Sequence, residues 1–185
     1  YIYIFDGCFS SEGGLCLTFK TYLSTFFFCF FTWLITLVLG LCVAYFLAFY
    51  VNSIPLQVCL FLVCTIPFWT SNVIRMVSWI PLLGRNGLVN EFFLSLGIIV
   101  KPIEWLLYSS FSVILALVHL YTLFMIVPIF NSMIRIDRSI VEAAYDAGAS
   151  HLQIIFTIII PLTKTGIIIG SIFVVTVVMG DFLTI

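Results

Sequence analysis

The feature that most constrains this chain is a long run without a single charged residue, between Lys20 and Arg75. As one helix, positions 21–74 would extend roughly 80 Å at about 1.5 Å per residue, whereas the hydrocarbon core of a bilayer is about 30 Å thick. The run must therefore turn back on itself. The segment VNSIP at 51–55 supplies a turn, because Asn and Ser bond to the backbone and Pro stops a helix. We predict one membrane span near 24–50 and a second near 56–79.

Composition indicates that the solvent for most of this chain is lipid. Of 185 residues, 63% are hydrophobic and 8% are charged, and the mean hydropathy is +1.28. A soluble domain has about 25% charged residues, so this chain has too few charges to cover a surface that faces water. The net charge of -1, without a basic or acidic tract, gives no indication of nucleic-acid binding. An integral membrane protein is predicted.

The remaining spans follow from the places where polar residues return. Residues 80–106 contain Gly, Pro and charged residues, and we predict a connection there with a short, partly apolar helix. A third span is expected near 107–131, a polar connection over 132–163 and a fourth span near 165–185. Long apolar segments predict an all-α, polytopic transmembrane helix bundle, since barrel strands alternate over about ten residues. The chain begins at Tyr1 and stops in an apolar run, so we expect a fragment that lacks both ends.

One stretch, residues 137–161, is far more polar than its surroundings and predicts a helix, a bend and a second helix. Asp137 or Ser139 can cap the first helix, and Ser139 with Glu142 fits a capping box. Gly148 can adopt the left-handed conformation that ends a helix without a steric clash.

The second helix is expected to restart after this bend. Ser150 with Gln153 fits another capping box, and Pro161 is expected to break the helix before the last span. A rigid protrusion of this kind suits the docking of a partner protein. An amphipathic segment that lies on lipid explains the same residues, so the residue types leave both interpretations open.

The stretch EAAYDAGASHLQIIFTIIIP at 142–161 resembles the EAA loop of binding-protein-dependent ABC importer permeases, whose pattern is E-A-A-x-x-x-G, nine residues and I-x-L-P. Ile160 stands where that pattern has Leu. Segments 67–93, 124–144 and 159–171 are similar to the spermidine/putrescine branch of the family, specifically to the first of its two permease subunits. The identities in register are Glu142, Ala143, Ala144, Gly148, Ile158 and Pro161.

The resemblance implies a type I importer permease in the cytoplasmic (inner) membrane of a bacterium, with residues 1–21 as an extracytoplasmic segment and 22–185 as the permease domain. It implies three protein partners: a cytoplasmic ABC ATPase dimer, a second homologous permease subunit and an extracytoplasmic substrate-binding protein. It places 132–163 in the cytoplasm and 80–106 outside, an orientation that the balanced Lys and Arg counts do not give. The implied function is a path for a small solute, in this branch a polyamine such as spermidine or putrescine.

The residues that the resemblance assigns to ATPase docking lie around the glycine bend. Glu142 would present its carboxylate to a basic residue of the ATPase, although helix capping explains it as well. Small alanine side chains would let a partner backbone approach closely, and a solvated polar face is the alternative for Asp146. The implied docking set is Glu142, Ala143, Ala144, Asp146, Gly148, Ser150 and Pro161.

Two charged residues are candidates for the translocation path or its outer mouth. Arg75 lies near the outer end of the second span, where it could snorkel to the interface, line the path or contact the binding protein. Asp181 lies deep in the last span, and a carboxylate that faces lipid is costly. We expect Asp181 inside the bundle or at its outer mouth, where it could attract a polyamine; the alternative is a pair with an Arg or Lys beyond this chain. His119 is expected to be a hydrogen-bonded residue of the bundle.

No catalytic, cofactor or metal site is predicted. The chain lacks G-x-x-x-x-G-K-[ST], so ATP hydrolysis must come from a partner, and His151 has no second metal ligand at a suitable spacing. The alternative function is a self-sufficient secondary carrier or channel for a small cation, for which broken helices and several intramembrane charges are typical. Cys8 and Cys16 could form a disulfide in an oxidising compartment or remain free thiols.

Overall fold

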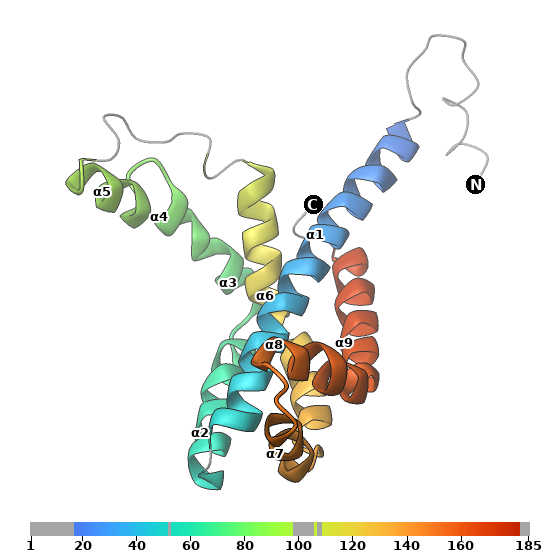
Figure 1. Cartoon of the computed structure of the whole chain (residues 1–185). Helices are drawn as coiled ribbons and strands as arrows, with labels where there is room; N and C mark the ends of the chain where they lie inside the picture. The colour runs from blue at the N-terminus through green and yellow to red at the C-terminus, as the bar shows by residue number, and fades with distance from the viewer. Residues whose placement is uncertain (1–16, 52, 98–105, 107–108, 182–185) are drawn as a thin grey trace.

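The computed structural model describes residues 17–51, 53–97, 106 and 109–181, and within these ranges the ordered elements are all helical. Three helices there are long and apolar enough to cross a membrane: Phe19–Tyr50, Ser110–Met133 and His151–Gly180. Figure 1 shows them crossing one another as a bundle. The predicted all-α, polytopic transmembrane fold is confirmed.

The core of the bundle is the contact of α1 (Leu17–Tyr45), α6 (Ser110–Met133) and α9 (Ile160–Gly180). Helix α1 continues as the π-helical element η2 (Phe46–Tyr50). Small residues let the helices approach closely, since a Cβ on Gly40 would lie 2.7 Å from Met125 Cγ. The outward faces carry exposed apolar side chains, as a lipid solvent requires. The fully buried apolar residues include Ala44, Leu117, Met125, Ile129, Val174 and Val178.

The segment predicted as the second span, 56–79, is not one helix. Helix α2 (Ile54–Thr65) has 12 residues, about 18 Å at 1.5 Å per residue, which is too short for the bilayer core. It is followed by the 3-10 helix η3 (Ile66–Trp69), α3 (Asn72–Val77) and α4 (Trp79–Leu83). Pro67 favours the interruption, because it has no backbone N–H with which to continue the helical hydrogen bonds. The expected turn before α2 is present, with Pro55 in the first helical turn.

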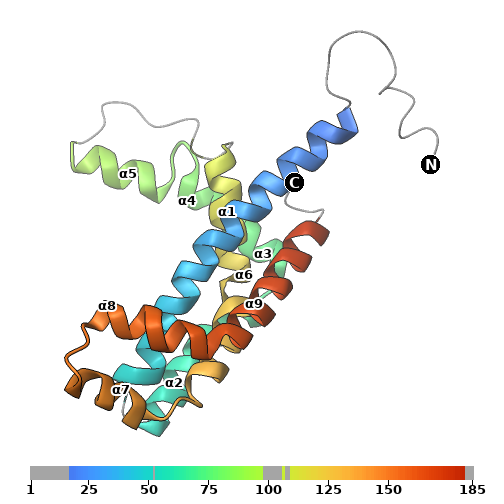
Figure 2. The same cartoon turned by 45° about the vertical axis from the view of Figure 1, so that its right-hand side comes forward.

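The connection after this broken segment contains the short helices α4 and α5 (Leu88–Ser95), in agreement with the short helix predicted within 80–106. Asn90 holds their turn together: its amide is 1% exposed and donates to Gly84 O at 3.0 Å. In both Figures 1 and 2, α4 and α5 extend sideways from α6. They lie toward the end of the bundle opposite α7 (Arg138–Asp146) and α8 (His151–Ile154).

The last span begins earlier than predicted. Helix α8, the π-helical element η4 (Ile155–Ile159) and α9 form one continuous helix from His151 to Gly180. The expected break at Pro161 is therefore wrong, because Pro161 occupies the first turn of α9, where its missing N–H and fixed φ are tolerated. Figures 1 and 2 show instead that the axis bends between α8 and α9. A bend is expected where a π-turn and a proline coincide.

Candidate functional site

The polar stretch at 137–161, hereafter the elbow segment, begins with an aspartate cap. Asp137 has extended backbone geometry, and its carboxylate accepts the N–H of Ser139 at 3.2 Å. Of the two predicted caps, Asp137 is correct. The predicted Ser139–Glu142 capping box does not form, because Asp137 starts the helix two residues earlier and Ser139 is already inside its first turn.

The bend of the elbow segment rests on Gly148. Its φ of +82° lies in the left-handed region, which costs other residues roughly 1–2 kcal/mol. The Gly148 N–H donates to Tyr145 O at 2.8 Å and the Ala149 N–H donates to Ala144 O at 3.0 Å, which is the Schellman pattern for ending a helix. Nothing lies within 4 Å of a Cβ built on Gly148, so only its dihedral angle, and no lack of space, requires glycine.

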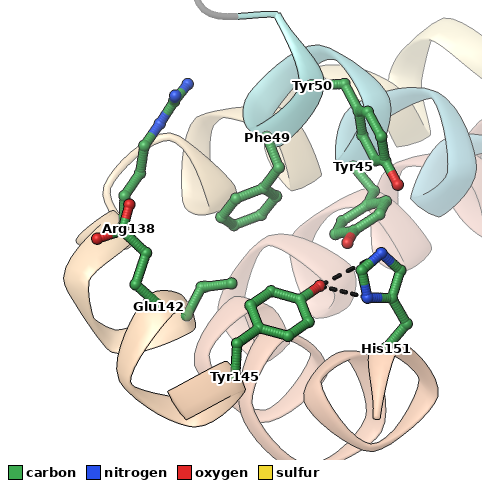
Figure 3. Close-up of a pocket in the computed structure, with 8 residues that line it drawn as sticks. Tyr45, Phe49, Tyr50, Arg138, Glu142, Tyr145 and His151 are labelled. Carbon is green, nitrogen blue, oxygen red and sulfur yellow. Dashed lines mark hydrogen bonds between the residues drawn. The ribbon is translucent and has the colours of Figure 1, made fainter. Parts of the chain in front are cut away.

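The second half of the elbow segment restarts as the sequence predicts. Ser150 Oγ accepts the Gln153 N–H at 3.4 Å, and Gln153 Oε1 accepts the Ser150 N–H at 2.9 Å. This reciprocal pair is a complete capping box. Across the bend, the Tyr145 hydroxyl lies 2.5 Å from His151 Nδ1, a contact drawn in Figure 3. The two halves are thus held at a fixed angle by backbone and side-chain bonds.

The predicted docking residues lie mostly on the exposed side of this elbow. Ala144 is partly buried, whereas the other six are exposed. Val141, Ile154 and Ile159 are buried and anchor the segment to the bundle. The elbow segment therefore has a buried inner face and an exposed outer face, and a cavity of about 440 Å³ is lined by residues 147–149, 153, 154, 157 and 158. The exposed docking residues are Glu142, Ala143, Asp146, Gly148, Ser150 and Pro161.

The elbow segment is also bonded to the end of the first span, a connection that sequence reasoning missed. The Arg138 guanidinium donates to Ala48 O at 3.3 Å and to Val51 O at 3.4 Å. These carbonyls lie at the C-terminal end of η2, where backbone acceptors lack helical partners and attract cations. The sequence shows only an arginine at the start of an expected helix. Such a residue does not reveal acceptors that lie 87 and 90 positions away.

A second cavity, of about 270 Å³, lies between the elbow segment and the first span. The first span contributes Tyr45, Phe49 and Tyr50, and the elbow segment contributes Glu142, Tyr145 and His151 along with Val141 and Arg138. In Figure 3 the aromatic rings gather on one side and Glu142 lies on the other, with the guanidinium of Arg138 turned away from the rings.

Of the two candidates for the path, Asp181 is bonded to α6, whereas Arg75 is bonded within its own helix. The Tyr121 hydroxyl donates to Asp181 Oδ2 at 2.6 Å. Arg75 is only 8% exposed and donates to Asn72 Oδ1, so it does not extend to the surface as a snorkelling side chain would. Asp181, at the end of α9, is partly buried and faces the bundle.

His119 differs from its prediction. It is exposed on α6, and its ring packs edge-on against Trp79 with centroids 5.6 Å apart. It was expected to form a hydrogen bond inside the bundle, but a ring contact with α4 positions it instead. Cys8 and Cys16 lie outside the described residues.

Comparison with known proteins gives clear relatives, although no family model matches the chain. The spermidine/putrescine transport system permease protein PotB of Escherichia coli K12 is 42% identical over 147 residues, covering 79% of this chain and 52% of the relative. PotB of Haemophilus influenzae is 40% identical over 123 residues, covering 66% and 42%. The inner membrane ABC transporter permease protein YdcU of E. coli K12 is 25% identical over 158 residues, covering 79% and 50%. This chain spans about half the length of the curated relatives it matches.

Proposed function

We propose that this chain, which belongs to the ABC importer permeases of the spermidine/putrescine type, is a membrane-spanning subunit that forms part of the translocation path for a polyamine. The observation that carries the proposal is the 40–42% identity to spermidine/putrescine permease proteins over most of the chain. The three membrane-length apolar helices support a path-forming role. The chain supplies no nucleotide-binding loop, so the energy comes from a separate ATPase.

The working transporter then contains a cytoplasmic ABC ATPase dimer, a second homologous permease subunit and an extracytoplasmic substrate-binding protein. Its location is the bacterial inner membrane. In this orientation the elbow segment faces the cytoplasm and residues 80–106 lie outside, with residues 1–21. The arrangement of the described residues supports this, because the elbow segment and helices α4 and α5 lie toward opposite ends of the bundle.

The outer face of the elbow segment is the proposed docking surface for the ATPase. Its exposed Glu142 carboxylate can pair with a basic side chain, and exposed Ala143 permits close approach of a partner backbone. A docking element must hold its shape while force is applied to it. The Schellman turn at Gly148, the capping box at Ser150 and the Tyr145–His151 contact supply that rigidity.

Asp181 and Arg75 are proposed to line the outer part of the path. A polyamine ammonium group that reaches Asp181 must compete with the Tyr121 hydroxyl. That competition weakens the binding of a polyamine at Asp181, and a solute must bind weakly enough in the path to leave it again.

One observation favours the alternative, a self-sufficient carrier for a small cation. The second predicted span is interrupted by short helices, one of which carries the buried Arg75, and interrupted helices with an intramembrane charge are typical of carriers. The permease names of the relatives weigh against it, and the same experiment separates the two hypotheses.

The test is co-purification and uptake with the full-length permease, its partner permease, the ATPase and the binding protein. We expect spermidine uptake in proteoliposomes that requires ATP and binding protein. Glu142→Lys should abolish ATPase association, whereas Glu91→Lys, an exposed glutamate on α5, should not. Uptake that proceeds without ATPase would instead establish the carrier.

A further inference from the structure

We propose that the cavity between the elbow segment and the first span is a binding site for a linear alkylammonium ion, through which cytoplasmic polyamine inhibits its own import. The proposal rests on the function proposed above for its biological meaning, whereas the binding itself does not depend on it. It concerns the cavity of about 270 Å³ lined by Tyr45, Phe49, Tyr50, Glu142 and Tyr145.

Most of the described residues that line this cavity are aromatic. Tyr45 and Phe49 have ring centroids 5.3 Å apart, and Tyr45 and Tyr50 have ring centroids 5.9 Å apart at an interplanar angle of 76°. From the other side, the Tyr145 hydroxyl lies toward Tyr45 in Figure 3. Rings that are tilted against one another and line one volume can turn faces toward it, and ring faces attract cations.

The charges around the cavity also favour a cation. Glu142 lines it, is exposed, and forms no hydrogen bond or ion pair with any residue that the structure describes. Among the described residues that line the cavity, Arg138 is the one with a permanent positive charge. Its guanidinium is bonded to Ala48 O and Val51 O, and Figure 3 shows it turned away from the rings. The carboxylate is therefore available to a ligand, whereas the guanidinium is already engaged.

Size restricts the ligand further. Sites for small ligands are commonly about 300–1,000 Å³, and this cavity lies just below that range. A linear aliphatic chain fits such a volume, with methylene groups against the rings and an ammonium near Glu142. Aliphatic amines have pKa values near that of lysine, about 10.4, so they are cationic at neutral pH. Putrescine and spermidine belong to this chemical class.

The position of the cavity links binding to transport. One wall belongs to the end of the first span and the other to the elbow segment, which is also the proposed docking surface. A ligand that contacts both walls stabilises the arrangement in which they lie at this distance. Any step of the transport cycle that moves the elbow segment relative to the first span is then opposed by the ligand. Rising cytoplasmic polyamine would slow further uptake.

The experiment uses the assembled full-length transporter in nanodiscs, without binding protein, and measures the Kd of radiolabelled spermidine. The test variant is Tyr50→Leu, which removes a ring at a 57% exposed position, and its control is Tyr22→Leu, 65% exposed on the same helix. We expect Tyr50→Leu to raise Kd about three- to tenfold, the effect of losing one cation–π contact. Tyr22→Leu should leave Kd unchanged, and Tyr50→Phe, which keeps the ring, should bind like wild type.

A second readout is ATP hydrolysis stimulated by spermidine-loaded binding protein, measured at rising free spermidine. The inhibitory concentration should shift in Tyr50→Leu by the same factor as Kd. Equal binding in Tyr50→Leu and wild type overturns the proposal, as does binding that is lost in Asp181→Asn alone, because the ligand then sits at the other end of the bundle. If loaded binding protein fails to stimulate wild type, the proposed import function fails, while the binding comparison still decides on the cavity.

Discussion

The elbow segment and the seam between α6 and α9 are built in opposite ways. Within the elbow segment, the bonds that set its angle join residues at most six positions apart, such as Tyr145 with His151. The seam joins residues far apart in sequence: Gly166 and Gly170 pack on α6, and Tyr121 bonds to Asp181 across 60 positions. The elbow segment can therefore keep its shape while the helices of the bundle move relative to one another. The contacts of the seam, in contrast, exist only when α6 and α9 are packed together.

This difference suits the two roles proposed for the chain. A docking element transmits force best as a rigid piece, so locally closed bonds are an advantage. A path must open and close, which requires contacts that two helices can make and release. The π-helical element η4 lies within the elbow segment, and η2 is bonded to it through Arg138; such wide turns are frequent at functional sites. Substitutions at the elbow and at the seam should accordingly fail in different ways.

The largest effect is expected from Gly166→Leu in the seam. A Cβ on Gly166 would lie 2.4 Å from both Pro128 O and Ser132 Oγ, so the helices must separate. Overpacking of this kind costs about 3 kcal/mol, and the thermal inactivation temperature of the purified transporter should fall steeply. The control is Gly180→Leu, where nothing lies within 4 Å. Equal losses in both variants would mean that close packing at Gly166 does not hold the seam.

Gly148→Val tests the elbow and should have the next largest effect. At φ +82° a β-branched residue is strained by about 2 kcal/mol. If the backbone changes its dihedral angle to relieve this strain, the two hydrogen bonds of the Schellman turn are lost. We expect the permease to remain in the membrane with near-normal thermal stability but to lose ATP-driven uptake. Gly148→Asn is the control, since Asn tolerates this conformation, and it should retain most uptake. A Gly148→Val protein that unfolds globally would contradict the view that the elbow is an independent unit.

Tyr121→Phe tests the seam where α6 is bonded to the end of α9. It removes the hydroxyl that donates to Asp181, a bond to a charged group worth about 1.5 kcal/mol. Because the bond ties α6 to the end of α9, we expect a moderate loss of thermal stability together with altered spermidine uptake. Tyr22→Phe, at an exposed position on α1, should change neither. Lower stability with normal uptake would assign the Tyr121–Asp181 pair to structure alone.

The same contrast explains what the sequence could predict. The turn at Gly148, the Ser150–Gln153 box and the Asp137 cap were predictable because each depends on residues a few positions apart. The Tyr121–Asp181 bond, the burial of Arg75 and the Arg138 bonds to the first span were not, because each joins elements whose docking no local pattern records. Apolar periodicity also failed at Pro67 and Pro161. Both prolines lie in apolar runs, yet the helix is interrupted at Pro67 and continues with a bend at Pro161, a difference that the apolar pattern does not record.

The smallest expected effect is also the most direct test of local control, since the elbow segment offers two serines in capping-box sequences. Ser150 forms its box with Gln153, whereas Ser139 does not form one with Glu142. Loss of a cap costs about 0.5–1 kcal/mol, so Ser150→Ala should speed hydrogen exchange of amides 151–154 about threefold to fivefold. Ser139→Ala should leave exchange in α7 nearly unchanged. If the two variants respond alike, the elbow is held by its contacts with the bundle, and the distinction between a locally built elbow and a long-range seam is lost.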